Sequence, residues 1–137
     1  MREVRGVVVA HVCLAAALVE AAERISGIEG ALTAISNVGL SPDALLTGIA
    51  DAVGDGPAIL FTDLASGSCT FACSSLVRTH PALAVVTGTN LAMLIDFLFN
   101  RDQAFRELAG RVVEKGRSGS MVLFPGGERD AAGPVSD

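Results

Sequence analysis

The sequence predicts an α/β protein with an open, mainly parallel sheet of about four strands flanked by helices. Two observations predict this class. Apolar runs such as Val7–Ala10 and Ala58–Phe61 are continuous, as in strands that are buried on both faces. Longer segments with helical spacing separate these runs, and this alternation is typical of parallel strands joined by crossover helices. The length of 137 residues suits one domain with a buried core, which we expect to span residues 1–124.

Five strands are predicted from apolar runs bounded by turn residues. They cover Arg5–Ala10, Gly30–Ser36, Pro57–Asp63, Leu83–Thr87 and Ser120–Phe124. Helices fill the intervals, and one of them shows a typical start, with Ser41 as N-cap and Pro42 in the first helical position. The predicted helices are Cys13–Ser26, Pro42–Val53, Cys69–Thr79 and Leu91–Lys115, the last with a break near Asn100. Residues 125–137 are rich in Gly, Pro and charge and are predicted to form a flexible tail.

Composition excludes several classes of function. Half of the residues are hydrophobic and only 18% are charged, as in a globular protein. The net charge of −5 and the lack of a basic cluster argue against a nucleic-acid partner. No stretch of about 20 apolar residues is free of charged or turn residues, so we expect no insertion into a membrane. The N-terminal residues do not resemble a signal peptide, and a cytoplasmic protein with reduced cysteines is therefore expected.

A histidine directly follows the first predicted strand. The carboxyl ends of parallel strands are where open α/β sheets bind their ligands, so His11 is placed at the edge that carries chemistry. Asp63 ends the third strand at the same edge and could orient the imidazole, leaving one ring nitrogen as a nucleophile. We expect the loop at Gly88–Asn90, after the fourth strand, to complete one pocket with them. The alternatives are a hydrogen-bonded loop histidine and an aspartate that caps its own turn.

The loop Ser66-Gly67-Ser68 precedes the third predicted helix. It offers two hydroxyls, a flexible glycine and free backbone N–H groups at a helix N-terminus, a combination that favours anions such as a phosphoryl group. No Gly-Lys-Ser/Thr sequence is present, so the loop is not a nucleotide-binding Walker motif. The alternative is an ordinary turn from strand to helix.

Neither a metal site nor another cofactor is predicted. Cys69 and Cys73 are four residues apart, and with His11 and Cys13 they do not reproduce the spacing of zinc motifs. We interpret the three cysteines as small buried hydrophobic residues. His80, before a proline, is expected at the surface without a partner.

Three segments in order resemble the mannose-family IIA domain of the bacterial phosphoenolpyruvate-dependent sugar phosphotransferase system (PTS). An apolar first strand ends in a histidine, at His11. The segment Ile59–Ser68 is similar to the family's third strand and its Asp-x-x-Gly-Gly-Ser loop, and Val86–Leu94 resembles its Gly-x-Asn-x-Pro-Met-Leu segment. In that family the histidine accepts a phosphoryl group from the phosphocarrier HPr and passes it to a IIB domain.

The resemblance implies a phosphotransferase with His11 as phosphoacceptor, Asp63 as its partner, and the loop Ser66–Ser68 on the phosphate side. It also implies a homodimer, with the strand Ser120–Phe124 exchanged between subunits, and a separate chain as the IIB partner. This sequence departs from the family at Val12, Ser66, Cys69 and Ala92, where glycine, glycine, proline and proline are usual. Two other readings therefore stay open: a regulatory module whose phosphorylation state controls a protein partner, and a binding domain without covalent chemistry.

Overall fold

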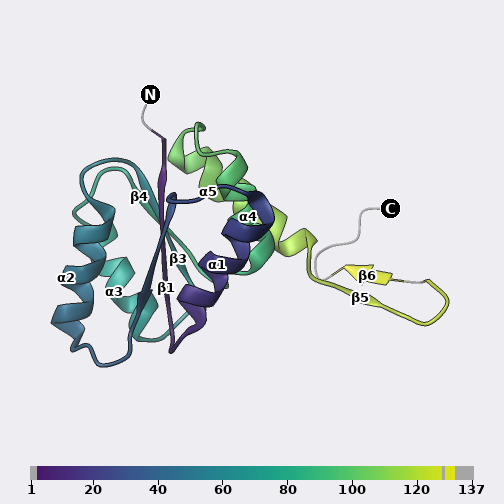
Figure 1. The fold of residues 1–137 in the computed structure, drawn as a ribbon, viewed down its shortest axis with the longest axis horizontal. Helices are drawn as coiled ribbons and strands as arrows, with labels where there is room; N and C mark the ends of the chain where they lie inside the picture. Colours follow the sequence, from purple (N-terminus) through teal and green to yellow (C-terminus); the bar gives the residue numbers. More distant parts are fainter. Residues whose placement is uncertain (1–2, 128, 132–137) are drawn as a thin grey trace.

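A four-stranded parallel sheet in the order β2-β1-β3-β4 forms the centre of the molecule, which confirms the predicted fold class. The computed structural model describes residues 3–127 and 129–131 (Figure 1). The strands of this sheet are β1 (Arg5–Ala10), β2 (Leu32–Ser36), β3 (Ala58–Thr62) and β4 (Leu83–Val86). Each lies within or coincides with a strand predicted from the sequence.

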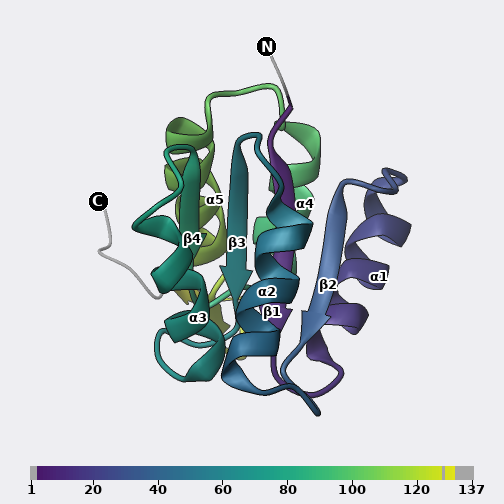
Figure 2. The same cartoon turned by 90° about the vertical axis from the view of Figure 1, so that its left-hand side faces the viewer.

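Helices cover both faces of the sheet. Figures 1 and 2 show α2 and α3 on one face, and α1, α4 and α5 on the other. Their bounds are Leu14–Ser26 for α1, Pro42–Val53 for α2, Ser68–Val77 for α3, Leu91–Phe99 for α4 and Phe105–Ser118 for α5. The Ser41 side chain accepts the N–H of Ala44 and caps α2, as predicted. The long helical segment is broken as expected, because α4 ends at Phe99 and α5 starts six residues later.

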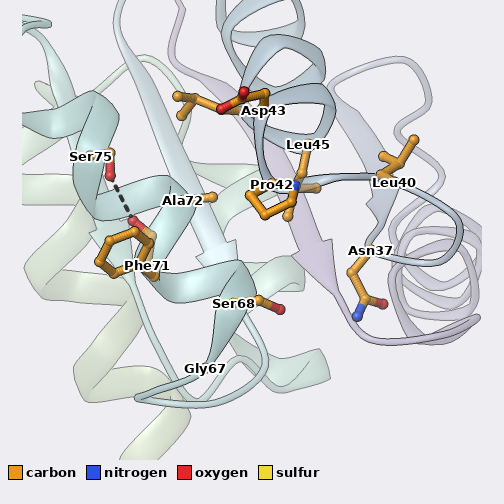
Figure 3. A pocket seen from close by; sticks show the side chains of 11 residues that line it. Asn37, Leu40, Pro42, Asp43, Leu45, Gly67, Ser68, Phe71, Ala72 and Ser75 are labelled. Atoms are coloured by element: carbon orange, nitrogen blue, oxygen red, sulfur yellow. Dashed lines mark hydrogen bonds between the residues drawn. The ribbon is translucent and has the colours of Figure 1, made fainter.

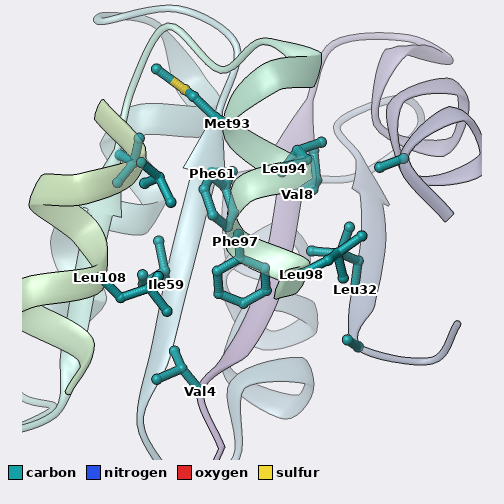
Figure 4. Packing of buried hydrophobic residues seen from close by; sticks show 14 of the residues in the cluster. Val4, Val8, Leu32, Ile59, Phe61, Met93, Leu94, Phe97, Leu98 and Leu108 are labelled. Carbon is teal, nitrogen blue, oxygen red and sulfur yellow. The ribbon is translucent and has the colours of Figure 1, made fainter. Parts of the chain in front are cut away.

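Strand β1 is buried on both faces, and its side chains alternate between two cores. Val7 and Val9 pack with residues of α2 and α3, whereas Val8 and Ala10 belong to the core under α1, α4 and α5. Figure 4 shows the second of these cores, where Phe61 and Phe97 meet edge to face with ring centroids 5.2 Å apart. The two cores hold β1 from both sides and thereby fix the position of the residue that follows it, His11.

The strand order decides which loops surround His11. Because β1 has β2 on one side and β3 on the other, the loops that leave these two strands flank the end of β1. The chain runs from β1 outward to β2 and then back past β1 to β3, so β1 and β3 meet at the switch point where open α/β sheets form their binding crevice.

The C-terminal part forms a separate hairpin. Strand β5 (Met121–Leu123) pairs antiparallel with β6 (Arg129–Ala131), and Figure 1 shows both strands away from the central sheet. The predicted fifth strand is therefore present, with a partner that lies inside the segment predicted as a tail. Residues 128 and 132–137 of that predicted tail lie outside the described residues. None of the helices in the described part of the chain combines the length and apolar character of a membrane span.

Candidate functional site

The structure brings His11 and Asp63 into direct contact at the carboxyl ends of β1 and β3. The register pairs Val9 with Thr62, so the residues that follow each strand lie beside one another. Oδ2 of Asp63 lies 2.8 Å from Nδ1 of His11 and accepts the backbone N–H of the same residue at 3.0 Å. The other carboxylate oxygen accepts the N–H of Leu64 at 3.1 Å. Asp63 thus holds both the ring and the main chain of His11.

The charge of Asp63 determines the tautomer of the imidazole. Burial raises the pKa of Asp63, but the hydrogen bonds from the backbone and the ring of His11 outweigh burial and hold this pKa below its usual value. Asp63 is therefore a carboxylate at neutral pH and can only accept hydrogen bonds. The proton of a neutral His11 ring must lie on Nδ1, which leaves the lone pair of Nε2 free as a nucleophile.

The predicted loop at Ser66–Ser68 lies on the Nε2 side of the ring. A Cβ placed on Gly67 would be 3.9 Å from Nε2 and 3.8 Å from Cε1 of His11. Gly67 has φ +108° and ψ 178°, a conformation that is essentially restricted to glycine, and it is the N-cap of α3. The N–H groups of the first turn of α3 have no partner within the helix. They and the exposed Ser66 and Ser68 can hold an anion next to Nε2.

The cavity beside this loop lies on a side that the sequence analysis did not predict. It has a volume of about 600 Å³ and lies between the loop after β2, the start of α2, and α3 (Figure 3). Of the predicted site residues, Gly67 and Ser68 line it. The side chains of Leu40, Pro42 and Phe71 make much of its wall apolar. A cavity of this kind next to a polar edge suits a protein or small-molecule partner.

The loop after β4 lies beside the end of β3, because the N–H of Thr89 donates to the carbonyl of Thr62 at 3.0 Å. That this loop completes one pocket with His11 and Asp63 stays a prediction. Gly88 and Asn90 line a second cavity, together with residues of α4 and α5. The side chain of Asn90 caps α4 by accepting the N–H of Met93 and donates to the carbonyl of Gly116. Asn90 therefore connects α4 with α5. Strand β3 lies between β4 and β1.

The end of β2 and the loop that follows it hold the residue after His11. Asn37 Oδ1 accepts the N–H of Val12 at 3.1 Å, and the Ser36 hydroxyl donates to the Val12 carbonyl at 2.6 Å. Both peptide groups of Val12 are thereby fixed, one residue after the histidine. Sequence reasoning missed Ser36 and Asn37, although both stand at the carboxyl end of a predicted strand.

Val12 itself is held in an unfavourable conformation. Its φ is +58°, and it is the one residue other than glycine with a positive φ in the described part of the chain. A β-branched side chain in the left-handed region is strained, and its 64% exposure means that core packing does not offset the strain. The hydrogen bonds with Ser36, at the end of β2, and with Asn37, in the loop after it, hold Val12 there.

We expect Val12→Gly to raise the free energy of unfolding by about 1 kcal/mol, because relief of roughly 1–3 kcal/mol of strain exceeds the entropic cost of glycine. Val12→Asn should fall between the two, since asparagine tolerates the left-handed region. Urea denaturation monitored by circular dichroism measures this difference. A free energy of unfolding that is lower for Val12→Gly than for the wild type would contradict the inference that Val12 is strained.

The cysteines and His80 differ in part from what was expected. All three cysteines are free, and Cys69 and Cys73 are buried as predicted, but Cys13 is exposed. Burial, and then the proximity of Cys69, raise the pKa of Cys73 to about 12. His80 is not without partners: its Nδ1 accepts the N–H of Ala82, and its Nε2 lies 3.2 Å from the carbonyl of Gly54.

Fold and site together define an α/β domain with a carboxylate-oriented histidine at the carboxyl edge of a parallel sheet. The family model EIIA-man, described as PTS system fructose IIA component, matches residues 6–114, a range that includes both His11 and Asp63. The chain belongs to this family, and its family and fold support the role of a IIA component of the phosphotransferase system. No curated protein matches the chain by sequence.

Solved structures with the same fold include two that are described as phosphotransferase system IIA proteins. The mannose/sorbose specific IIA subunit of the phosphotransferase system from Enterococcus faecalis is 25% identical, with a TM-score of 0.78 over 90% of this chain and 96% of that one. The phosphotransferase system component EIIA from Streptococcus agalactiae is 21% identical, with a TM-score of 0.80 over 85% and 95%. A sigma-54 interaction domain protein from Enterococcus faecalis is 14% identical and shares the fold, with a TM-score of 0.70 over 85% and 93%.

Proposed function

We propose that this protein is a cytoplasmic phosphohistidine carrier of the phosphoenolpyruvate-dependent sugar phosphotransferase system. His11 accepts the phosphoryl group from HPr and passes it to a separate IIB component. The observation that carries the proposal is the contact between Nδ1 of His11 and the Asp63 carboxylate, which leaves Nε2 as the nucleophile. Membership of the family supports it, because the matched range contains both residues.

The geometry suggests how the transfer proceeds. Nε2 of His11 attacks the phosphorus of phospho-HPr, the P–N bond of the donor breaks, and the donor imidazole leaves with the electron pair and takes up a proton. The His11 ring then carries a positive charge, which the Asp63 carboxylate stabilises through Nδ1–H. The phosphoryl oxygens face the loop at Gly67, where backbone N–H groups and the Ser68 hydroxyl can donate to them. Transfer to IIB reverses these steps.

The surface around His11 suits the docking of protein partners. Large hydrophobic side chains are exposed in the loops that leave β1, β2 and β3 and on the first turns of α3; they are Val12, Val38, Leu40, Leu64 and Phe71. Exposed apolar residues gathered at one edge are typical of interaction surfaces. HPr and the IIB component would dock here in turn, since both must bring a reactive group to Nε2.

Incubation with phosphoenolpyruvate, enzyme I and HPr tests the proposal. We expect the intact mass of the protein to rise by one phosphoryl group that is lost in acid, because a phosphohistidine is acid-labile. HPr phosphorylation is measured in the same mixture as a control for the donor. A folded protein that stays unlabelled beside phosphorylated HPr would refute the carrier function.

A regulatory role is the second candidate, in which the phosphorylation state of His11 controls a protein partner without sugar transport. A protein described as a sigma-54 interaction domain protein has the same fold. The departures at Val12 and Cys69 change residues next to the histidine and favour a partner other than a standard IIB domain. Onward transfer distinguishes the two roles, because a carrier loses its phosphoryl group to a IIB domain and a regulator retains it.

We further propose that the protein is a homodimer, formed through the hairpin of β5 and β6. The apolar side chains of Met121, Val122, Leu123 and Phe124 are all exposed, with Leu123 at 71%. None of them belongs to either core of the same subunit. Exchange of this segment between subunits would bury them, as in the family.

Light scattering at micromolar concentration measures the oligomeric state. We expect a dimer for the wild type and a monomer for Leu123→Asp, with unfolding of the central domain little changed. A wild type that is monomeric at these concentrations would contradict the proposed exchange.

A further inference from the structure

A third metal-ligating side chain lies beside His11 and Asp63. The Sγ of Cys69, one ring nitrogen of His11 and one carboxylate oxygen of Asp63 all lie within 4.8 Å of one another. They come from three different segments: the end of β1, the end of β3 and the first turn of α3. The set contains Cys69 with His11 and Asp63, but neither Cys13 nor Cys73. The spacing of the cysteines along the sequence therefore did not predict it.

The dimensions and the chemistry of the set suit a divalent cation with an affinity for sulfur and nitrogen. Zinc bonds of about 2.0–2.3 Å place tetrahedral ligand atoms roughly 3.3–3.8 Å apart, so small side-chain rotations would close the set around the ion. Imidazole, thiolate and carboxylate are the donors that zinc takes in proteins, whereas magnesium and calcium require oxygen. The His11 side chain is 34% exposed, which leaves a route for the ion and a fourth position open to water.

The Cys69 sulfur also lies close to the Asp63 carboxylate. A divalent ion between the two would attract both, and the thiol proton would leave to the solvent as the ion binds.

We propose that His11, Asp63 and Cys69 form a binding site for zinc or a similar thiophilic divalent cation, and that the bound ion blocks phosphoryl transfer. The second part rests on the proposed function of His11 as phosphoacceptor. An ion on Nε2 occupies the nucleophile itself. An ion on Nδ1 displaces the hydrogen bond to Asp63, so that the proton of the neutral ring moves to Nε2 and removes its lone pair from reaction. In both cases the metal and the phosphoryl group exclude each other.

Cobalt(II) provides the direct test, because a thiolate ligand gives it a charge-transfer absorption. We expect the reduced, metal-free protein to bind one cobalt ion per chain with this absorption, and zinc to displace it. The absorption should disappear in Cys69→Ala and His11→Ala, and persist in Cys13→Ser and Cys73→Ala. Cys73 lies one turn further along α3 and is the matched control for a buried thiol. Equal absorption in Cys69→Ala, or no cobalt uptake by the wild type at micromolar metal, would overturn the site.

A second measurement follows the transfer itself, with purified phospho-HPr as donor so that enzyme I is absent. Loss of a ligand should weaken metal binding by more than the 10- to 100-fold of an outer-shell change. Zinc at about ten times the wild-type Kd leaves roughly one tenth of the sites free, so labelling of the wild type should slow about tenfold. Labelling of Cys69→Ala, relative to its own metal-free rate, should change little. Equal inhibition of both proteins would overturn the regulatory part. A wild type that is not labelled even without zinc would refute the phosphocarrier function, while the cobalt result would still decide the metal site.

Discussion

His11→Ala is expected to abolish labelling by phospho-HPr, since the substitution removes the only nitrogen that the proposed mechanism uses as a nucleophile. The rest of the site should persist, because Asp63 still accepts the backbone N–H of residue 11 and that of Leu64. The His11 side chain is partly exposed and belongs to neither core, so the free energy of unfolding should change by no more than about 1 kcal/mol. Intact mass and thermal denaturation measure the two quantities on the same sample.

His80 offers the matched control, since it is the second of the two histidines in the chain. Its ring contacts the backbone at Gly54 and Ala82, at the opposite edge of the sheet from His11. His80→Asn should therefore lose some stability and retain full labelling. An acid-labile phosphate that remains on His11→Ala would mean that another residue accepts the phosphoryl group, and it would contradict the assignment of His11.

Asp63→Asn is expected to slow labelling by up to about 10⁴-fold, the size of the effect when the carboxylate that orients a catalytic histidine is neutralised. An amide cannot serve all three of the N–H groups around residue 63. If its oxygen accepts from His11, its NH₂ group faces the N–H of Leu64, and two donors then oppose each other. The positive charge of the phosphorylated ring also loses its partner. The stability cost of one mismatched donor should be about 1–3 kcal/mol.

Asp96 is the control for the loss of stability on replacing a hydrogen-bonded carboxylate by an amide. Its buried carboxylate accepts two hydrogen bonds from Arg111, at 3.0 and 3.1 Å, between α4 and α5. Asp96→Asn should lose stability to a similar extent and accept phosphate at the wild-type rate. Equal labelling rates for Asp63→Asn and the wild type would assign Asp63 a purely structural role.

The pH dependence of stability provides a further check on Asp63. Its pKa is lower in the folded protein than the usual 3.8, so the stability that it contributes is present above pH 3.8 and is lost as the pH falls through the folded pKa. Acid titration of the free energy of unfolding should show a smaller loss for Asp63→Asn than for the wild type in this window. Identical acid profiles would mean that the contact with His11 does not stabilise the ionised form.

The sequence was sufficient for the sheet and for the contact between His11 and Asp63. Continuous valines identify β1 as a strand buried on both faces, and the residues that end parallel strands must meet at one edge. What the sequence did not show is which segment holds the residue after His11. This depends on the strand order, which is set by long-range packing of helices on both faces and not by any local pattern, and so Ser36 and Asn37 were not among the predicted residues.

Three other features could not be read from local sequence for related reasons. The strain at Val12 arises because Ser36 and Asn37 hold its peptide groups, and these residues are over 20 positions away. The proximity of Cys69 to His11 depends on the angle at which α3 leaves its glycine N-cap. Strand β6 lies in a segment whose composition predicts a tail, and its pairing partner β5 is itself short.

The two-sided burial of β1 has a consequence for how this protein can change over evolution. Hydrogen exchange should be slowest along β1, since its amides open only when both cores come apart. The proposed phosphoacceptor is thus attached to the element that should open last, whereas several residues around it lie on exposed loops. Loop substitutions can alter which partners are accepted, at little cost to the fold. A change such as the one at Val12, which is 64% exposed, therefore leaves both cores intact, while these cores fix the position of His11.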